Sequence, residues 1–366
     1  MKRIMVSLLV LLMLGTGMLF AGGAAEAPEA AAADDSFKAL YLVNGNLGDK
    51  GFYDSAASGF YTLRDEDGAT IKIVEMGRNE ASYEGYYLDA SEQDWDVIVS
   101  GTWSVKELAE DVARQFPEKD YIFFDGTTDV ENLMGVAYRS NETAFMAGAL
   151  AALMLDSGDA KIDGSERTLG FIGSMDVVNI NDFLIGYIDG IKYIDPSIRV
   201  LTSYVGSFED VPKCMEMTTQ LYNQGAQIVY APASQSILGA VTASSNKDKY
   251  LIACDTDIWS AMVETDANLV RNVLSSSLKK VGESLVVAMR GLQDGSMKTT
   301  ENYTLGLKSG SVGLADNDNY RKLVSGTIRT QLDELAVKVG DGAIPVREAF
   351  GMTTEQVAEI RDSMKP

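Results

Sequence analysis

The chain of 366 residues contains no histidine and only two cysteines, Cys214 and Cys254. Without histidine it cannot form a Ser-His-Asp triad, a histidine zinc site or the general base that enzymes use most often near neutral pH. A thiolate zinc site of the usual kind needs more ligands than two cysteines supply. These absences exclude several large classes of hydrolase and metalloenzyme, and we expect no metal site and no cofactor.

The two cysteines lie in different predicted elements. Cys214 falls in a helical pattern and Cys254 in a strand pattern. An oxidising compartment would allow a disulfide between them. Buried free cysteines are common in such elements, however, and we expect free thiols.

The usual phosphate-binding and nucleophile motifs are also missing. Residues 45–51, GNLGDKG, follow G-x-x-G-x-x-G instead of the G-x-G-x-x-G of dinucleotide-binding folds. The chain has no G-x-x-x-x-G-K-[ST] loop and no G-x-S-x-G elbow. Nothing recognisable supplies a nucleophile with its base, so we expect a protein that is not an enzyme.

Positive charge is scarce. The sequence has 31 Lys and Arg against 53 Asp and Glu, a formal net charge of -22. Such acidity disfavours binding to nucleic acid or anionic membrane surfaces through non-specific electrostatics. We therefore expect no nucleic-acid partner.

The N-terminus has the pattern of a secretory signal. In residues 1–21, Lys2 and Arg3 precede an apolar stretch, and Ala21 is a small residue before the expected cleavage site. No cysteine that could accept a lipid stands near this site. Residues 22–36 are low in complexity and predict a flexible linker. The mature protein is expected to be soluble, in the periplasm or outside the cell.

From Phe37 onward, predicted strands alternate with predicted helices, which is typical of parallel sheets with helices on both faces. The first series has strands near residues 39–43, 70–74, 97–100, 121–124 and 133–138. The second has strands near residues 169–172, 200–205, 228–230, 251–254 and 269–274, followed by a helix at 276–290 and a further strand at 303–307. The two series predict two similar lobes.

Polar and aromatic residues follow many of these strands. In open α/β sheets, ligands bind at the carboxyl ends of the strands, so these residues are candidates for a cleft between the lobes. Carboxylates there can accept hydrogen bonds from sugar hydroxyls, and aromatic rings can stack on a base. The candidates are Asn44, Asn46, Trp103, Asp125, Met175, Asp176, Ser234, Gln235, Asp255 and Asp257.

Four segments resemble the basic membrane protein family of substrate-binding proteins, which serve ABC importers and include nucleoside-binding members. They are LGDKGFYDSAASG at 47–59, GFIGSMDVVNINDFLIGYIDGIKY at 170–193, VRNVLSSSLKKV at 270–281 and LGLKSGSVGLA at 305–315. Their order matches the family's order and they span most of the mature chain.

The resemblance implies a type I periplasmic-binding-protein fold, with two Rossmann-like lobes joined by three crossovers. The first lobe would hold residues 37–139 and 276–300, and the second 140–275 and 301–366. The crossovers would lie near residues 138–141, 275–279 and 298–303.

The resemblance also implies a set of ligand-binding residues. Phe52 and Phe183 would stack on a base from opposite lobes, and Asp125 would accept from the base edge or a hydroxyl. Asp255 would accept from ribose, with Lys279 donating to a hydroxyl or holding Asp255. The remaining implied residues are Asn44, Tyr53, which stands where the motif has Asn, and Gly239, which would allow close backbone approach.

The implied function is capture of a nucleoside, expected to be a purine nucleoside, and its delivery to an ABC permease of the inner membrane by a monomeric protein. Two alternatives remain at this stage. The chain could be a secreted ligand sensor of the same fold, or the cleft could bind a sugar.

Overall fold

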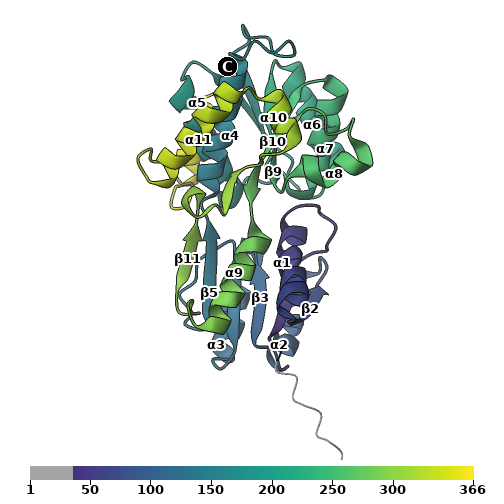
Figure 1. Ribbon diagram of the computed structural model, residues 1–366, viewed down its shortest axis with the longest axis vertical. Helices are drawn as coiled ribbons and strands as arrows, with labels where there is room; N and C mark the ends of the chain where they lie inside the picture. The colour runs from purple at the N-terminus through teal and green to yellow at the C-terminus, as the bar shows by residue number, and fades with distance from the viewer. Residues whose placement is uncertain (1–35) are drawn as a thin grey trace, which may run out of the picture. The chain divides into compact units, whose positions relative to one another are not determined.

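Two β-sheets, each with helices on both faces, organise residues 36–366, the part of the chain that this computed structural model describes (Figure 1). The strand orders are β11-β5-β4-β3-β1-β2 and β12-β10-β9-β8-β6-β7. The pairings are parallel except for β10 with β12, which is antiparallel. The same order of connections occurs twice, and the predicted α/β fold of two lobes is confirmed.

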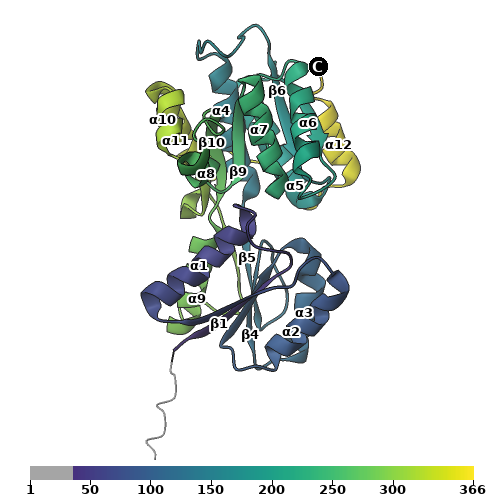
Figure 2. The same ribbon diagram turned by 90° about the vertical axis from the view of Figure 1, so that its right-hand side faces the viewer.

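The first lobe is built from strands β1 (Lys38–Val43), β2 (Thr70–Glu75), β3 (Val97–Gly101), β4 (Asp120–Phe124), β5 (Leu133–Tyr138) and β11 (Asn302–Leu305). Its α-helices are α1 (Phe52–Asp67), α2 (Tyr83–Ser91), α3 (Lys106–Gln115) and α9 (Val281–Asp294). Its short 3-10 turns are η1 (Glu80–Ser82) and η2 (Trp103–Val105). Figure 2 shows α1 and α9 on one face of the sheet and α2 and α3 on the other.

The second lobe is built from strands β6 (Thr168–Gly173), β7 (Arg199–Tyr204), β8 (Ile228–Tyr230), β9 (Tyr250–Asp255), β10 (Val273–Lys279) and β12 (Val312–Leu314). Its α-helices are α4 (Ser140–Leu155), α5 (Val178–Ile194), α6 (Val211–Asn223), α7 (Ile237–Lys247), α8 (Ile258–Asp266), α10 (Asp318–Leu323), α11 (Gly326–Gly340) and α12 (Thr354–Asp362). Its 3-10 turns are η3 (Ser234–Ser236) and η4 (Leu307–Ser309).

The segment around Lys279 is a strand instead of the predicted helix. β10 runs from Val273 to Lys279, and α9 begins only at Val281. The run of Ser275, Ser276 and Ser277 lacks the apolar residues by which a buried strand is recognised, yet all three side chains are buried. The Ser275 hydroxyl donates to the Ala315 carbonyl over 2.9 Å, which shows how the strand satisfies buried polar groups.

The lobe boundaries differ from the expected ones for the same reason. β10 belongs to the second sheet up to Lys279, so the second crossover lies at Lys280. β11, expected in the second lobe, pairs in parallel with β5 of the first. The third crossover therefore follows Leu305 instead of lying at 298–303. The first crossover is Arg139, between β5 and α4.

Helices α4 and α5 pack closely at the centre of the second lobe. A Cβ atom on Gly186 of α5 would lie 2.2 Å from the backbone oxygen of Asn141 at the start of α4. Only glycine permits so close an approach. This contact holds α5 against the point where the chain enters the second lobe.

Cys214 and Cys254 are buried free thiols, which confirms the prediction for them. Burial raises the pKa of the Cys214 thiol to about 11, so the reactive thiolate is scarce near neutral pH. The predicted leader and linker, 1–21 and 22–36, lie almost wholly outside the described residues. Among residues 36–366, no helix is long and apolar enough to cross a membrane.

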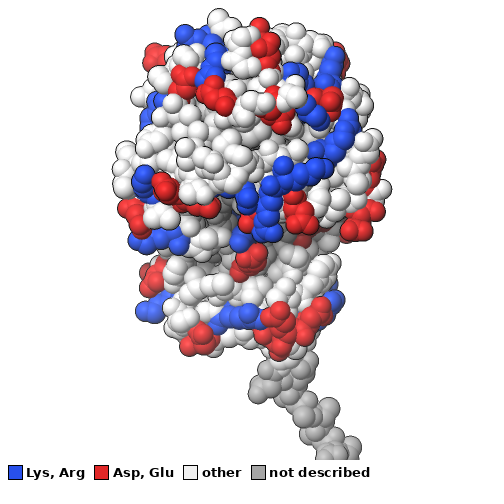
Figure 3. Space-filling view, turned by 45° about the horizontal axis from the view of Figure 1, so that its top comes forward, with Lys and Arg blue, Asp and Glu red and all other residues white. Residues whose placement is uncertain are grey.

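Charged side chains of both signs cover the surface. On the face in Figure 3, Lys and Arg form a band across the second lobe with Asp and Glu beside it. Many are paired, as in the 2.8 Å contact between Arg321 and Asp316. Exposed pairs of this kind contribute at most about 1 kcal/mol each, so the buried cores carry most of the stability.

Candidate functional site

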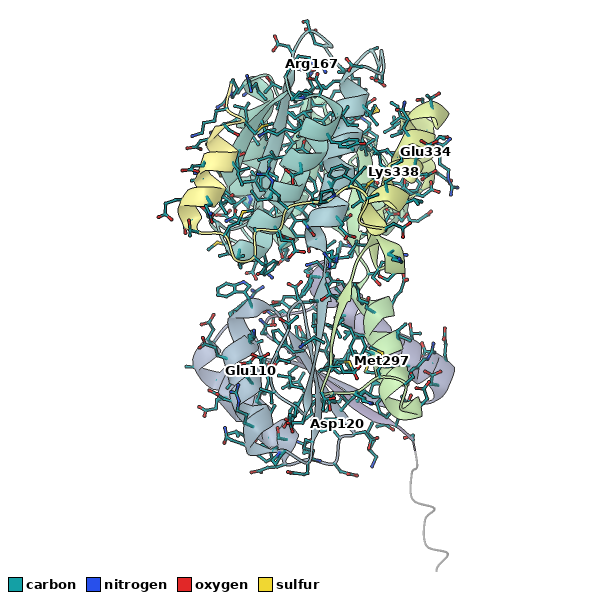
Figure 4. The ribbon with its side chains drawn as sticks, turned by 90° about the vertical axis from the view of Figure 1, so that its left-hand side faces the viewer. Glu110, Asp120, Arg167, Met297, Glu334 and Lys338 are labelled. Atoms are coloured by element: carbon teal, nitrogen blue, oxygen red, sulfur yellow. The ribbon has the colours of Figure 1, made fainter. Side chains whose placement is uncertain are left out.

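A cavity of about 230 Å³ lies where the carboxyl ends of strands from both sheets meet. Its lining includes seven of the eight predicted ligand-binding residues: Asn44, Phe52, Tyr53, Asp125, Phe183, Asp255 and Lys279. Trp103 of η2 also lines it. Figure 4 labels Asp120 and Arg167, which lie at the far ends of the first and second lobes.

Gly239 is the exception. It lies on α7, where an added Cβ would be 2.1 Å from the backbone oxygen of Val211 at the start of α6. The glycine does allow close backbone approach, but between two helices instead of toward a ligand. It is not part of the cavity lining.

A buried ion pair joins the two lobes at the cavity. Lys279, at the end of β10, is 4% exposed and donates from Nζ to Asp125 Oδ1 over 2.8 Å. Asp125 belongs to the first lobe, and its Oδ2 accepts from Asn179 Nδ2 of α5 over 3.1 Å. Lys279 was expected to donate to a ligand hydroxyl or to hold Asp255, but the carboxylate that it binds is that of Asp125.

Charge and burial oppose each other in this group. Burial alone would lower the pKa of Lys279, but the carboxylates of Asp125 and Asp255 raise it above its usual value. Burial raises the pKa of Asp255, and the Lys279 charge acts in the opposite direction. Lys279 is therefore a stable ammonium beside two acids, one of which it binds directly.

Two phenylalanines face this ammonium from opposite lobes. Lys279 Nζ lies 5.4 Å from the ring centroid of Phe52 on α1 and 5.3 Å from that of Phe183 on α5. Phe183 also meets Tyr230 edge-on, with centroids 6.4 Å apart. The cavity thus combines aromatic faces from both lobes with a cation and carboxylates.

The strand ends that carry the acids have an unusual backbone. Asp125 after β4 and Asp255 at the end of β9 both have a φ of 67°. Thr102 after β3 and Ser234 after β8 also have positive φ, at 80° and 51°. Such values are uncommon outside glycine and gather at functional sites. They occur at corresponding places in the two lobes, a repeat that the residues themselves do not reveal.

Asn44 has a structural task in this arrangement. Its Nδ2 donates to Thr102 Oγ1 over 2.6 Å and to Ser104 Oγ over 3.1 Å. The Tyr53 hydroxyl donates to the backbone oxygen of Asn44 over 3.2 Å. These bonds hold the turn that presents Trp103, which is 50% exposed, at the cavity. The amide donors of Asn44 are thus already engaged by the protein.

Several lining residues escaped the sequence analysis. Asp49 is buried and accepts from the backbone N–H groups of Gly51, Tyr53 and Asp54 over 3.0, 3.0 and 3.1 Å. An aspartate just before a helix is a recognisable capping signal, so Asp49 could have been found. Among the others, Asn179 lies in the first turn of α5 and Glu80 begins η1. Arg78, Phe208 and Glu209 lie in loops without periodicity.

Two further contacts connect the lobes beside the cavity. Arg78, after β2, forms an ion pair with Glu209, which lies between β7 and α6. The Thr256 hydroxyl, just after β9, donates to the backbone oxygen of Lys50 over 2.6 Å. Together with the Lys279–Asp125 pair, they connect the lobes beside the cavity.

Comparison with known proteins gives consistent results. Residues 37–341 match the family described as "ABC transporter substrate-binding protein PnrA-like". Basic membrane protein A of Borreliella burgdorferi is 26% identical over 82% of this chain and 85% of its own length. The CD4+ T-cell-stimulating antigen of Listeria monocytogenes is 22% identical over 85% of this chain and 87% of its own length.

A solved solute-binding protein of an ABC transporter system from Aeropyrum pernix K1 has the same fold. It superposes with a TM-score of 0.76 at 21% identity, over 90% of this chain and 97% of its own. The arabinose-binding protein of Geobacillus stearothermophilus gives 0.59 at 11% identity, over 79% of this chain and 100% of its own. The chain therefore belongs to the PnrA-like, or basic membrane protein, family of ABC transporter substrate-binding proteins, an extracytoplasmic family.

Proposed function

We propose that the cavity binds a nucleoside, with a purine nucleoside as the best candidate, and that the protein delivers it to an ABC permease. The observation that carries the proposal is the placement of Phe52 and Phe183, from opposite lobes, around one space that Asp255 also lines. Aromatic faces suit a base, and a carboxylate suits the paired hydroxyls of ribose.

The charge of the lining supports an uncharged ligand over a phosphorylated one. Five carboxylates line the cavity, on Asp49, Glu80, Asp125, Glu209 and Asp255, against two cations, on Arg78 and Lys279. Lys279 is already bound to Asp125 and Arg78 to Glu209. A phosphate group would meet excess negative charge in a partly dehydrated space, where repulsion is strong.

Contacts between the lobes support capture by closure. Four polar contacts join the lobes at or beside the cavity: Lys279–Asp125, Asn179–Asp125, Arg78–Glu209 and Thr256–Lys50. Hinged closure around a ligand is a common motion of two-lobed binding proteins. We expect the ligand to be released unchanged by a monomeric protein, whose signal peptide has been removed during export.

The alternatives can be separated from this proposal. A permease and an ATPase encoded beside the gene would favour transport, and a receptor kinase or chemoreceptor would favour a sensor. Release of free base on incubation with a nucleoside would argue for an enzyme.

A thermal-shift screen tests the ligand class. We expect guanosine, inosine or a related nucleoside to raise the melting temperature, because a ligand at a hundred times its Kd stabilises the folded state by about 2.7 kcal/mol. Nucleoside monophosphates should shift it much less. A shift with ribose or arabinose and none with nucleosides would replace the proposal by a sugar-binding one.

A further inference from the structure

The coil between α11 and α12 leads to the hinge end of the second lobe. Figure 4 shows this yellow coil crossing the lower edge of the lobe from α11 to α12. The family match ends at residue 341, so the coil and α12 lie outside it. We call residues 346–349 of this coil the brace.

The brace is fastened to helix α5 at two points. Asp189 of α5 accepts from the backbone N–H and from Nε of Arg347, each over 3.0 Å. Asp182 lies about two turns earlier in α5. Its Oδ1 accepts from the backbone N–H of Ala349 over 2.8 Å. The brace is thus attached to α5 at two points, Asp182 and Asp189.

The same brace residues contact the start of α4. Asn141 donates its backbone N–H to Asp182 Oδ2 over 2.9 Å. Its side-chain Nδ2 donates to the backbone oxygens of Val346 and Arg347 over 3.3 and 3.2 Å. Asp182 therefore joins the brace to the first residues after the first crossover, using one oxygen for each.

An ion pair extends the brace to the crossovers themselves. Glu348 contacts Arg139, the residue of the first crossover, over 2.9 Å. The Arg139 backbone N–H donates to the Leu305 oxygen over 2.8 Å, at the end of β11. Glu142 accepts from the backbone N–H of Leu307, just past the third crossover, over 2.8 Å. Two of the three crossovers thus belong to one network with the brace.

This network also adjoins the cavity. Asp182 directly precedes Phe183, and Asn179 lies one turn earlier in the same helix. Phe183 and Asn179 both line the cavity. Asp182 is 1% exposed. Burial, and to a smaller extent the charge of Glu348, raises the pKa of Asp182 to about 7. The N–H groups of Ala349 and Asn141 and the charge of Lys279 act in the opposite direction. Burying a carboxylate costs free energy, and the hydrogen bonds that Asp182 accepts from Ala349 and Asn141 offset this cost.

We propose that residues 346–349 brace the hinge end of the second lobe in the arrangement that the closed lobes need, with Asp182 and Glu348 as positioning residues. The brace touches no ligand. It sets the balance between open and closed lobes, and through that balance the apparent affinity, because affinity falls with the fraction of binding-competent protein. The inference rests on the proposed closure and not on the identity of the ligand.

The test measures the distance between the lobes directly. Spin labels on introduced cysteines, Glu107→Cys in α3 and Glu216→Cys in α6, report the distance distribution, since both native cysteines are buried. Glu348→Gln should shift the ligand-free distribution toward longer distances. It should also weaken guanosine binding by about two- to fivefold, the range expected when an exposed ion pair is lost.

The matched control is Asp362→Asn, which removes the ion pairs with Lys365, over 2.8 Å, and with Arg361, over 3.2 Å, in the same C-terminal segment but away from the hinge. It should leave distances and affinity at wild-type values while changing the melting temperature about as much as Glu348→Gln. If Glu348→Gln gives the same distances and the same affinity as this control, the proposed role of the brace is wrong.

Asp182→Asn gives a second, stronger perturbation. We expect a larger shift toward long distances than with Glu348→Gln, in protein shown to be folded by circular dichroism. A wild-type distribution in folded Asp182→Asn would reduce the residue to a stabilising role and contradict the proposal. Distances in the ligand-free protein remain informative if no nucleoside binds, so failure of the brace and failure of the ligand proposal are distinguishable.

Discussion

Lys279→Met is expected to lower the free energy of unfolding by about 3–5 kcal/mol, the cost of removing one partner from a buried ion pair. The lysine side chain is 5% exposed and that of Asp125 is 14% exposed, so water replaces little of the lost interaction. Methionine fills a similar volume, which leaves the missing charge as the main change. Urea unfolding gives the value directly.

The neighbouring lysine provides the control. Lys280 has a 37% exposed side chain and lies 3.6 Å from Glu283 in an i,i+3 pair. Lys280→Met should cost less than about 1 kcal/mol. Adding Asp125→Asn to Lys279→Met should recover part of the loss, because the uncompensated carboxylate is then gone. Equal losses in the two lysine variants would mean that the pair does not carry the stability assigned to it.

Replacing Phe183 and Asp255 should separate recognition of the base from recognition of ribose. Stacking is worth about 1–3 kcal/mol per base, and a lost charged hydrogen bond costs a similar amount. Each change should therefore weaken guanosine binding by about tenfold to a hundredfold. Phe183→Ala should weaken guanosine and guanine alike, whereas Asp255→Asn should weaken guanosine and spare guanine. Calorimetric titrations measure all four affinities.

The choice of variants follows from the local structure. Asp255 has a φ of 67°, a conformation that asparagine tolerates better than alanine, so Asp255→Asn changes the charge without straining the turn. Phe183 is 3% exposed, and alanine leaves a hole there; Phe52→Ala repeats the test at the less buried ring. Tyr61→Ala, at a 41% exposed ring on the same helix as Phe52, is the control. Loss of guanine binding in Asp255→Asn would contradict the assigned roles.

The sequence predicted the parts of this protein that depend on local pattern. Strands with apolar runs, such as β4 and β9, were placed correctly, and the rule that ligands bind at strand ends directed attention to Asp125 and Asp255. Both residues line the cavity. The aromatic pair depended on the resemblance, since an aromatic at the start of a helix usually belongs to the core.

Other features depend on contacts between distant segments. β10 was expected at 269–274 and lies at Val273–Lys279, because the hydroxyls of its serines are satisfied by neighbours such as Ala315, forty residues later in the chain than Ser275. The sheet that β11 joins is decided by its pairing with β5. The ion pair of Arg78 with Glu209 joins two loops, and no periodicity links them. The role of Gly239 also depends on a distant segment, because the backbone that it approaches closely is that of the start of α6.

The proposed function requires that the cavity between the lobes binds a nucleoside. The most direct measurement is calorimetric titration of the protein, unfolded and refolded to remove any ligand carried through purification, with guanosine, guanine and ribose. We predict one guanosine per chain, bound at least about ten times more tightly than guanine or ribose, because only the nucleoside engages both the rings and Asp255. Tighter binding of ribose than of guanosine, or heat from neither guanosine nor any other purine nucleoside, would contradict the account.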